Sequence, residues 1–365
     1  MTLDFFPSRT LTLYLAKMFS LRIFAVLVML VLVLMMLDLL SNSGQILEVP
    51  GNTEADLWLY ASLRVPMLIQ RFLPYSVLLA TIITLVTLNQ NSEVIAMKAA
   101  GLSAHQVLAP LIVTALAVAS ISFAFNERVV TRATAQLTTW EATEFGALPD
   151  KPESKGSIYL EDGQNILTAR SYSGGGPAPT LRDVTYYRRS SAAEITEKID
   201  APMAVRGPDG WAMQNPTVFT VGTASLAQPT QLTVAPAITP AQIELQDVDP
   251  TTQPFWQLGN SIEAYRQAGR DTDELEANYW HKISGPLAAV LMPILGAVAG
   301  FGLARSGQLF MRALIGMALG FAYFVIDNAA LAMGDFGGYP PFLAAWAPFM
   351  LFLMIGETVL VRTEE

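Results

Sequence analysis

Six apolar runs, each about as long as a lipid bilayer is thick, dominate this sequence of 365 residues. A membrane-spanning helix needs about 20 mostly apolar residues. Hydrophobic residues make up 52% of the chain, charged residues make up 15%, and the mean hydropathy is +0.39. The chain is therefore predicted to be an integral membrane protein. The predicted spans are roughly residues 23–40, 61–88, 107–125, 283–304, 313–333 and 341–361.

A long polar insert separates the first three runs from the last three. Within it, short alternating segments are divided by turn residues, as at Asp162-Gly163 and at Pro208-Asp209-Gly210, which favours β-hairpins. We predict an α-helical membrane protein with six transmembrane helices in a 3+3 arrangement and an inserted all-β, jellyroll-like domain. The predicted boundaries are residues 1–126, 127–280 and 281–365.

The positions of lysine and arginine predict the orientation. Basic residues near the ends of the runs gather on the side that carries both termini, which predicts that this side is cytoplasmic. They are Arg9, Lys17, Arg22, Lys98, Arg305, Arg312 and Arg362. The β insert is then outside, in the periplasm if the membrane is a bacterial inner membrane. The first run is too long for a signal peptide and lacks a small-x-small cleavage pattern after it, so we interpret it as a retained span.

Several functional classes conflict with the composition. The formal net charge of −9 argues against nucleic-acid binding, and the absence of cysteine excludes disulfides and thiolate metal sites. The two histidines, His105 and His281, have no metal-ligand spacing, so no metal site is expected. No P-loop sequence occurs, and the chain is therefore not expected to bind ATP itself.

A short polar stretch, residues 91–103, lies between the second and third runs. Ser92 is suited to cap a helix, Glu93 favours its first turn, Lys98 lies near its other end, and Gly101 stops it. The pattern predicts a short cytoplasmic helix on which a soluble motor protein docks. An ordinary loop between two spans is the alternative.

A few polar residues within the spans point to particular contacts. Asp327 lies deep in the fifth run and is expected to face protein or a cavity, because a carboxylate exposed to lipid is costly. A pair with Asp38 would resemble an aspartyl protease, but Asp38 lies at a span end and this interpretation is disfavoured. His281 and Lys282 are interpreted as an interfacial anchor, and the glycine pairs 296/300 and 316/320 either as helix contacts or as ordinary span composition.

Several motifs together resemble one family, the LptF/LptG permeases of the lipopolysaccharide export machine, and within it more closely LptG. The likeness covers nearly the whole chain, including the 3+3 spans and the β insert. The motifs that carry it are Ser92-Glu93-Val94-Ile95-Ala96-Met97-Lys98-Ala99-Ala100-Gly101, Gly156-Ser157-Ile158-Tyr159 with Asp162-Gly163, Tyr279-Trp280-His281-Lys282-Ile283 with Pro286-Leu287, and Phe324-Val325-Ile326-Asp327.

The resemblance implies the partners. It implies a permease subunit of an ABC transporter that takes lipopolysaccharide from the outer leaflet of the inner membrane and passes it to a periplasmic bridge. The implied partners are a dimer of an LptB-type ATPase that binds ATP and Mg²⁺, an LptF-type sibling permease, an LptC-type single-span protein and an LptA-type bridge. The chain itself would then need no cofactor and would be no enzyme. The alternatives are the LptF-type subunit, a mechanotransmitting permease without a lipid substrate, and a membrane scaffold or sensor.

Four groups of site residues follow. Family members carry lysines just past the first span, where this chain has Ser41, Asn42 and Ser43, so the nearest basic candidates for the lipid head group are Arg64, Arg71, Arg128 and Arg132. The candidates for contact with the ATPase are Glu93, Val94, Met97, Lys98 and Gly101. An aliphatic first span without small residues and a fifth span with bulky aromatics predict a lateral gate at Leu30, Leu34, Met317, Phe321 and Phe324. An apolar groove in the β insert, at Ile158, Leu160 and Ile166, would favour lipid transport over the other functions.

Overall fold

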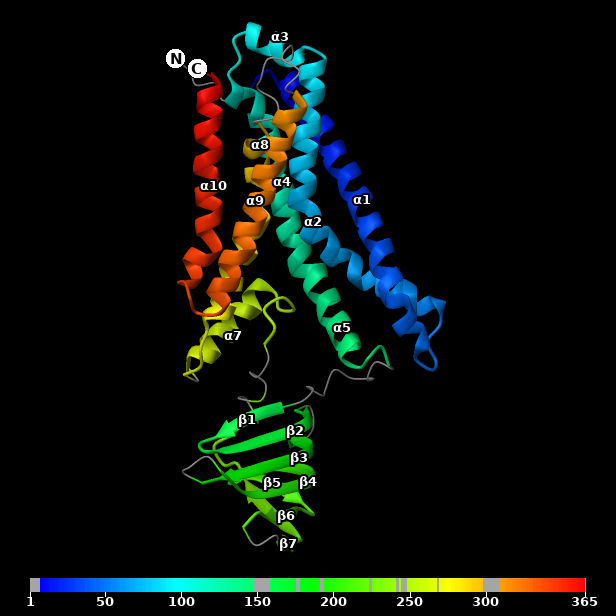
Figure 1. Ribbon diagram of the computed structural model, residues 1–365, viewed down its shortest axis with the longest axis vertical. Coiled ribbons are helices and arrows are strands. Elements are labelled where there is room, and N and C mark those ends of the chain that lie inside the picture. Colours follow the sequence, from blue (N-terminus) through cyan, green and yellow to red (C-terminus); the bar gives the residue numbers. More distant parts are fainter. Residues whose placement is uncertain are drawn as a thin grey trace. The chain divides into compact units, whose positions relative to one another are not determined.

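A computed structural model of the chain describes residues 7–146, 158–174, 178–190, 194–222, 225–240, 243, 248–267, 269–297 and 309–364 (Figure 1). The chain divides into two compact units. A helical unit comprises Met1–Gly146 and Asp249–Glu365, and a β unit comprises Ala147–Val248. The β unit is therefore an insert, as predicted, but it is shorter than the predicted 127–280. It is shorter because the chain stays helical from Glu127 to Ala142 and becomes helical again before the fourth run.

The helices of the first half continue beyond the predicted spans. They are α1 (Arg9–Glu48), α2 (Glu54–Gln90), α3 (Glu93–Ala99), α4 (Ala104–Phe125), a π-helical turn η1 (Asn126–Val130) and α5 (Thr131–Ala142). The sequence predicts a first span that ends near residue 40 and a second that begins near residue 61, and the loop of residues 42–60 that this implies is wrong, since only residues 49–53 separate α1 from α2. The polar residues after the first run stay helical because Ser41 Oγ and Asn42 Nδ2 donate to the carbonyl groups of Leu37 and Asp38, at 3.0 and 2.9 Å.

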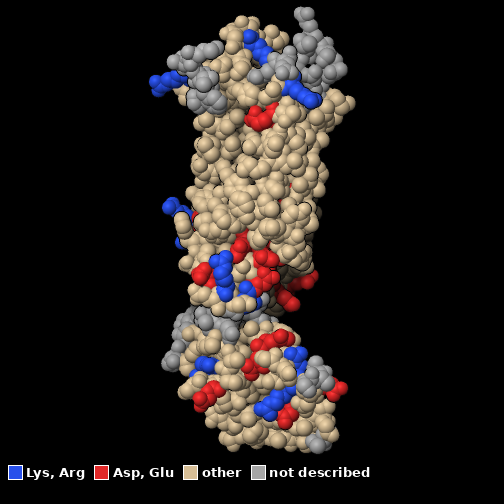
Figure 2. Space-filling model, turned by 90° about the vertical axis from the view of Figure 1, so that its left-hand side faces the viewer, with Lys and Arg blue, Asp and Glu red and all other residues tan. Residues whose placement is uncertain are grey.

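The second half contains α7 (Phe255–Gln267), α8 (Asp273–Gly296), α9 (Leu309–Asp335) and α10 (Pro341–Glu364). Among the described residues, five helical segments are long and apolar enough to span a membrane: Arg9–Glu48, Glu54–Gln90, Ala104–Ala142, Ala313–Asp335 and Pro341–Arg362. The predicted fourth span falls on α8 and on residues 298–308, which lie outside the described residues along with Arg305 and Gly300. On the face drawn in Figure 2, a broad belt of the helical unit shows almost no charged side chains between two ends where they gather.

Glycines allow the helices of this unit to approach closely. A Cβ atom at Gly296 of α8 would lie 2.7 Å from Thr81 Cγ2 of α2, and one at Gly320 of α9 would lie 2.2 Å from Leu78 Cδ2. Both glycines therefore mark helix contacts with α2, and the structure decides in favour of that interpretation at these two positions. α2 is accordingly a central helix of the bundle, against which α1, α8 and α9 all pack.

The β unit is one antiparallel sheet that forks. Its strands are β1 (Ile158–Asp162), β2 (Asn165–Ser173), β3 (Thr180–Arg189), β4 (Ile195–Gly207), β5 (Gly210–Gln214), β6 (Thr217–Thr220), β7 (Ser225–Ala227) and β8 (Gln231–Val234). Strands β1 to β4 are neighbours in sequence order. The first part of β4 then pairs with β6, which pairs with β7, while its last part pairs with β5, which pairs with β8. The described strands of the insert thus form an antiparallel sheet, which confirms the predicted β fold.

Both predicted hairpin turns are confirmed. Asp162 pairs with Asn165 across the first turn, where Gly163 has φ +63°, and Gly207 pairs with Gly210 across the second. At Gly210 only glycine fits easily, since φ is +139° and a Cβ atom would lie 2.7 Å from the carbonyl oxygen of Val234. The predicted motif residues Gly156 and Ser157 lie outside the described residues.

The core of the β unit lies on one face of the sheet. Trp211 is fully buried there, and its indole N–H donates to the carbonyl oxygen of Ile238 at 2.9 Å. Tyr186 is also buried, and its hydroxyl donates to Asp162 Oδ2 at 2.8 Å. Burial, together with this carboxylate, raises the pKa of Tyr186 to about 12, so the hydroxyl stays protonated and remains a donor.

Candidate functional site

The polar stretch between the second and third spans forms the short helix α3, as predicted. Gly101 has φ +85°, and its N–H donates to the carbonyl oxygen of Lys98 at 3.0 Å. The N–H of Leu102 donates to the carbonyl oxygen of Met97 at 3.1 Å. These two bonds form a Schellman motif, which ends the helix at the glycine.

The start of α3 differs from the prediction. Ser92 has φ +61°, in the left-handed region, and its side chain makes no capping hydrogen bond. The predicted serine cap is wrong, because capping requires a more extended backbone at that residue. The Asn91 side-chain amide instead donates to Glu93 Oε1 at 3.3 Å.

The two faces of α3 are unlike. Val94 and Met97 are buried in the hydrophobic core of the helical unit, at 4% and 8% exposure. Ile95 and Lys98 are exposed, and Glu93 is half-buried. Of the predicted coupling residues, Val94 and Met97 therefore fix α3 to the bundle, whereas the charged residues lie on the side that another protein can reach.

Glu93 also joins α3 to α1. The Tyr14 hydroxyl of α1 lies 3.2 Å from Glu93 Oε2 and 3.5 Å from Oε1, and it donates to this carboxylate. At the same end of the unit, His105 Nε2 of α4 lies 3.1 Å from Glu357 Oε2 of α10. Figure 1 shows the first turns of α1, the last turns of α10 and α3 together at this end. Side-chain contacts at this end therefore join α3 to α1 and α4 to α10.

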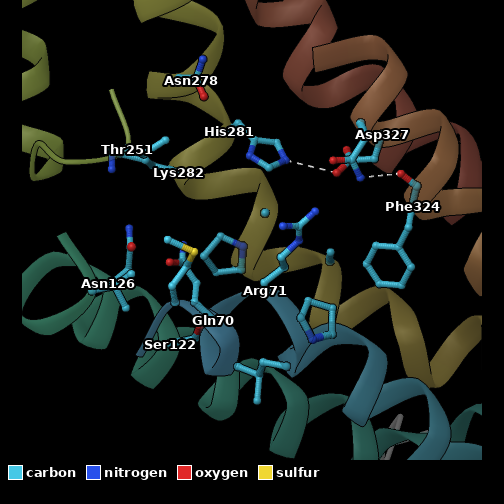
Figure 3. A pocket seen from close by; sticks show the side chains of 18 of the residues that line it. Gln70, Arg71, Ser122, Asn126, Thr251, Asn278, His281, Lys282, Phe324 and Asp327 are labelled. Atoms are coloured by element: carbon cyan, nitrogen blue, oxygen red, sulfur yellow. Dashed lines mark hydrogen bonds and ion pairs between the residues drawn. The ribbon is translucent and has the colours of Figure 1, made fainter. Parts of the chain in front are cut away.

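Toward the opposite end of the helical unit, a cavity of about 410 Å³ lies among α2, α4, η1, α5, α8 and α9 (Figure 3). Most of its lining side chains are polar, which is unusual for the interior of a membrane bundle. The polar residues include Arg71, Asn126, Asn278, His281, Lys282 and Asp327.

A buried carboxylate lies in the wall of this cavity. His281 Nε2 of α8 lies 3.1 Å from Asp327 Oδ2 of α9, and the Asp327 side chain is only 9% exposed. The other oxygen, Oδ1, has no hydrogen-bond partner among the residues that the structure describes. Gly285 leaves room for the histidine ring, since a Cβ atom there would lie 3.2 Å from His281 Cε1. The prediction that Asp327 faces protein or a cavity is confirmed.

Two cationic side chains reach the same space. Figure 3 shows the Arg71 guanidinium pointing into the cavity, and Lys282 lines it from α8. The ring of Tyr75 stacks on Phe324 with centroids 3.7 Å apart, so one wall is aromatic. Cations with several N–H donors beside an apolar wall suit an anionic oxygen group attached to a hydrophobic molecule.

The four arginines predicted for the head group are not brought together. Arg71 lines the cavity, whereas the Arg64 guanidinium lies against Asp38, 3.2 Å from its Oδ2. Arg128 on η1 and Arg132 on α5 are exposed and are not among the residues that line the cavity.

Sequence reasoning missed His281 and Lys282 as cavity residues, since both were interpreted as an interfacial anchor. The sequence signal that could have identified them is Asp327. A carboxylate in a span needs a polar partner at the same depth, and His281 was one of the few available in the neighbouring run.

The predicted gate residues also differ in their exposure. On α9, Met317 and Phe321 are 41% and 63% exposed and point away from the bundle, whereas Phe324 is buried against α2. Phe324 therefore belongs to the cavity wall rather than to an open face. On α1, Leu30 and Leu34 are half-buried.

The three predicted groove residues lie on two faces of the β sheet. Ile158 is buried in the core and Leu160 packs against it. Ile166 pairs with Glu161 and Tyr187, and the neighbouring Leu167 is the residue that points into the core. Because side chains alternate along a strand, Ile166 faces the other way from Ile158 and Leu160.

Comparison with known proteins gives a consistent result. A family model described as the lipopolysaccharide export system permease LptF/LptG matches residues 13–362. The chain is similar to the lipopolysaccharide export system permease protein LptG of Escherichia coli K12, with 25% identity over 83% of this chain and 85% of that protein. It is also similar to the LptG protein of Haemophilus influenzae, with 23% identity over 98% of this chain and 99% of that protein.

Proposed function

Because the chain belongs to the LptF/LptG family of lipopolysaccharide export permeases, we propose that it is the membrane subunit that takes lipopolysaccharide from the outer leaflet of the inner membrane and passes it outward. The observation that carries this function is the family match, which spans both helical halves and the β insert. The chain is a transporter subunit and not itself an enzyme.

The membrane arrangement we propose has six spans, with α8 and the residues after it as the fourth. Both termini and α3 are cytoplasmic, and the β insert is a periplasmic, jellyroll-like domain. The position of α3 beside the first turns of α1 and the last turns of α10 supports this arrangement (Figure 1), as do the lysines and arginines at that end.

We propose that ATP and Mg²⁺ are bound by a dimeric LptB-type ATPase and that α3 is its docking site. The sibling permease is LptF-type, an LptC-type single-span protein joins the complex, and an LptA-type bridge receives the lipid. The assignment to LptG rather than LptF rests on the two relatives described above, which both carry the LptG name. A scaffold, a sensor or a permease without a lipid substrate has no comparable support.

Reversing the charge of Glu93 is expected to weaken ATPase binding. Glu93→Lys should lower the amount of ATPase that co-purifies by about tenfold or more, since loss of a charged interface contact costs roughly 2–5 kcal/mol. Membrane insertion should be unchanged, because Val94 and Met97 still hold α3 in the core.

The matched control for this variant is Tyr14→Phe, which removes the hydrogen bond to Glu93 and keeps its charge. If Tyr14→Phe lowers ATPase binding as much as Glu93→Lys does, the effect comes from the contact within the chain. A fully coupled complex carrying Glu93→Lys would contradict docking through this residue.

Arg71 and Lys282 are the residues we propose for contact with the lipid phosphates. Both line the cavity, and phosphate oxygens accept well from guanidinium and ammonium groups. Arg128 and Arg132 are exposed and stay predictions, while Arg64 is already paired.

Photo-crosslinking in the β unit tests the proposed function. A crosslinker at Ile158 or Leu160 is expected to capture lipopolysaccharide when ATP is supplied to the whole complex and not without ATP. The chain offers its own control in Ile166, which lies on the opposite face of the same hairpin and should capture far less. Equal capture at all three positions would indicate non-specific contact, and no capture at Ile158 or Leu160 in an intact complex would contradict lipid passage along this face.

A further inference from the structure

Few side chains in the outer half of α1, residues 24–48, are fully buried, although α1 and α2 pack closely. Among residues 24–48, only Val31, Met35 and Ile46 are buried. Leu40, by contrast, is 79% exposed. The apolar side chains of this half gain little free energy by packing on α2 rather than on lipid, because lipid is as apolar as the side chains it would replace.

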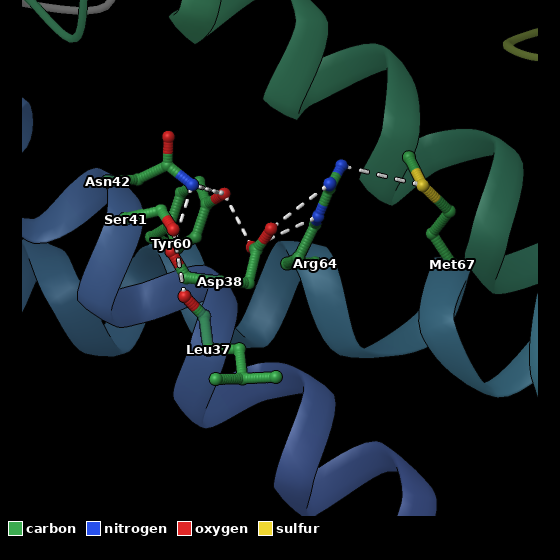
Figure 4. Close-up of polar contacts among 7 residues, drawn as sticks. All are labelled: Leu37, Asp38, Ser41, Asn42, Tyr60, Arg64 and Met67. Atoms are coloured by element: carbon green, nitrogen blue, oxygen red, sulfur yellow. Dashed lines mark hydrogen bonds and ion pairs between the residues drawn. The ribbon is translucent and has the colours of Figure 1, made fainter.

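A polar cluster joins this half of α1 to α2 (Figure 4). Asp38 of α1 lies between Arg64 and Tyr60 of α2. Arg64 Nε lies 3.2 Å from Asp38 Oδ2, and Arg64 Nη2 donates to Oδ1 at 3.2 Å. The Tyr60 hydroxyl donates to Oδ2 at 2.7 Å, and the Asn42 amide donates to the Tyr60 oxygen at 3.1 Å.

The cluster satisfies both oxygens of the carboxylate. The side chains of Arg64 and Asp38 are 26% and 19% exposed, so little water could solvate either charge if the other were removed. Separating them would leave two charges unpaired in or near hydrocarbon, which is far more costly than separating an ion pair on a soluble surface. The pair is therefore a contact between the outer half of α1 and α2 that lipid cannot replace.

We propose that Asp38 is a positioning residue. Together with Arg64 and Tyr60 it forms a clasp that holds the outer half of α1 against α2, and α1 leaves α2 when this clasp opens. Arg64 is then a structural partner of Asp38 and not a head-group contact. The contact between the two helices does not depend on the proposed function. Only its consequence for transport rests on that function, since α1 is predicted to border the lateral gate.

Distance measurement between spin labels tests the clasp. Leu40→Cys on α1 and Trp58→Cys on α2 are suitable label sites, because both residues are 79% exposed and the chain has no native cysteine. The full chain in its complex is expected to give one narrow distance peak. With Asp38→Asn or Arg64→Gln, a second population at longer distance is expected, with the ratio of close to distant molecules lowered about tenfold or more.

Two further variants separate the clasp from misfolding. Asp38→Arg with Arg64→Asp reverses the pair and is expected to restore the narrow peak. Asp38→Leu with Arg64→Leu removes both charges, so that insertion stays normal while the longer distance persists. Glu357→Gln, which breaks the pair with His105 at the other end of the unit, should leave the peak unchanged.

Either of two results would overturn the clasp. One is a narrow, native distance in the double leucine variant, and the other is a reversed pair that stays as broad as the single variants. Lipopolysaccharide export by the same variants tests the proposed function separately. A broad distance peak together with normal export would support the clasp and contradict its role in gating.

Discussion

With Leu34→Cys, a disulfide to a cysteine in the sibling permease is expected to stop lipopolysaccharide export, and reduction of the disulfide is expected to restore it. Leu34 is a half-buried residue in the outer half of α1, where we place one side of the lateral gate. A lipid with several acyl chains needs a wide opening, so a covalent bond across the gate should lower export by about tenfold or more, as for other conformational steps that limit turnover.

The experiment uses Leu34→Cys with single cysteines scanned along the fifth span of the sibling. The control is Met35→Cys, because Met35 is buried at 7% exposure on the neighbouring side of α1 and should not reach the sibling. A background without cysteine leaves no competing thiol in this chain. Export at the full rate by the crosslinked complex would show that these spans are walls and that the gate lies elsewhere.

The membrane spans could be predicted because hydropathy acts residue by residue. The ends of the spans could not, since they depend on where polar side chains find partners. Ser41 and Asn42 read as loop residues, but both bond to carbonyl groups one turn back, so α1 continues to Glu48. Likewise Glu127 opens a polar region in sequence and is still helical, where its carboxylate accepts from the N–H of Phe255.

The cavity and the clasp depend on which helices become neighbours. Asp38 and Arg64 are 26 positions apart, and His281 and Asp327 are 46 positions apart, so no local pattern relates them. The opposite orientation of Ile166, by contrast, could have been predicted from the sequence. The two-residue turn Gly163-Gln164 fixes the register of the hairpin, and alternation along β2 then puts Ile166 on the face opposite Leu160.

The close contact between α9 and α2 leads to a second large effect. Gly320→Val is expected to reduce the amount of folded protein strongly, because the Cβ position lies 2.2 Å from Leu78 Cδ2 and 3.1 Å from Leu78 Cδ1. Leu78 is 2% exposed and has little room to move. Overpacking of this kind typically costs about 1–3 kcal/mol and sometimes more. The measurement is the amount of folded protein in the membrane and its thermal midpoint after extraction.

The matched variant is Leu78→Ala, which removes about the volume that valine adds. Alone it should cost about 2–5 kcal/mol through the cavity it leaves, whereas the double variant should be more stable than either single variant. Gly44→Val on α1 is the control, since nothing lies within 4 Å of its Cβ position. A double variant less stable than both single variants would contradict the contact. If the contact holds, the inner face of α9 is fixed to α2, and only its exposed face, with Met317 and Phe321, is free to border the gate that we predict. The larger movement at the proposed gate is then expected in α1, because the proposed clasp at Asp38 can open, whereas the contact at Gly320 cannot loosen without losing close packing.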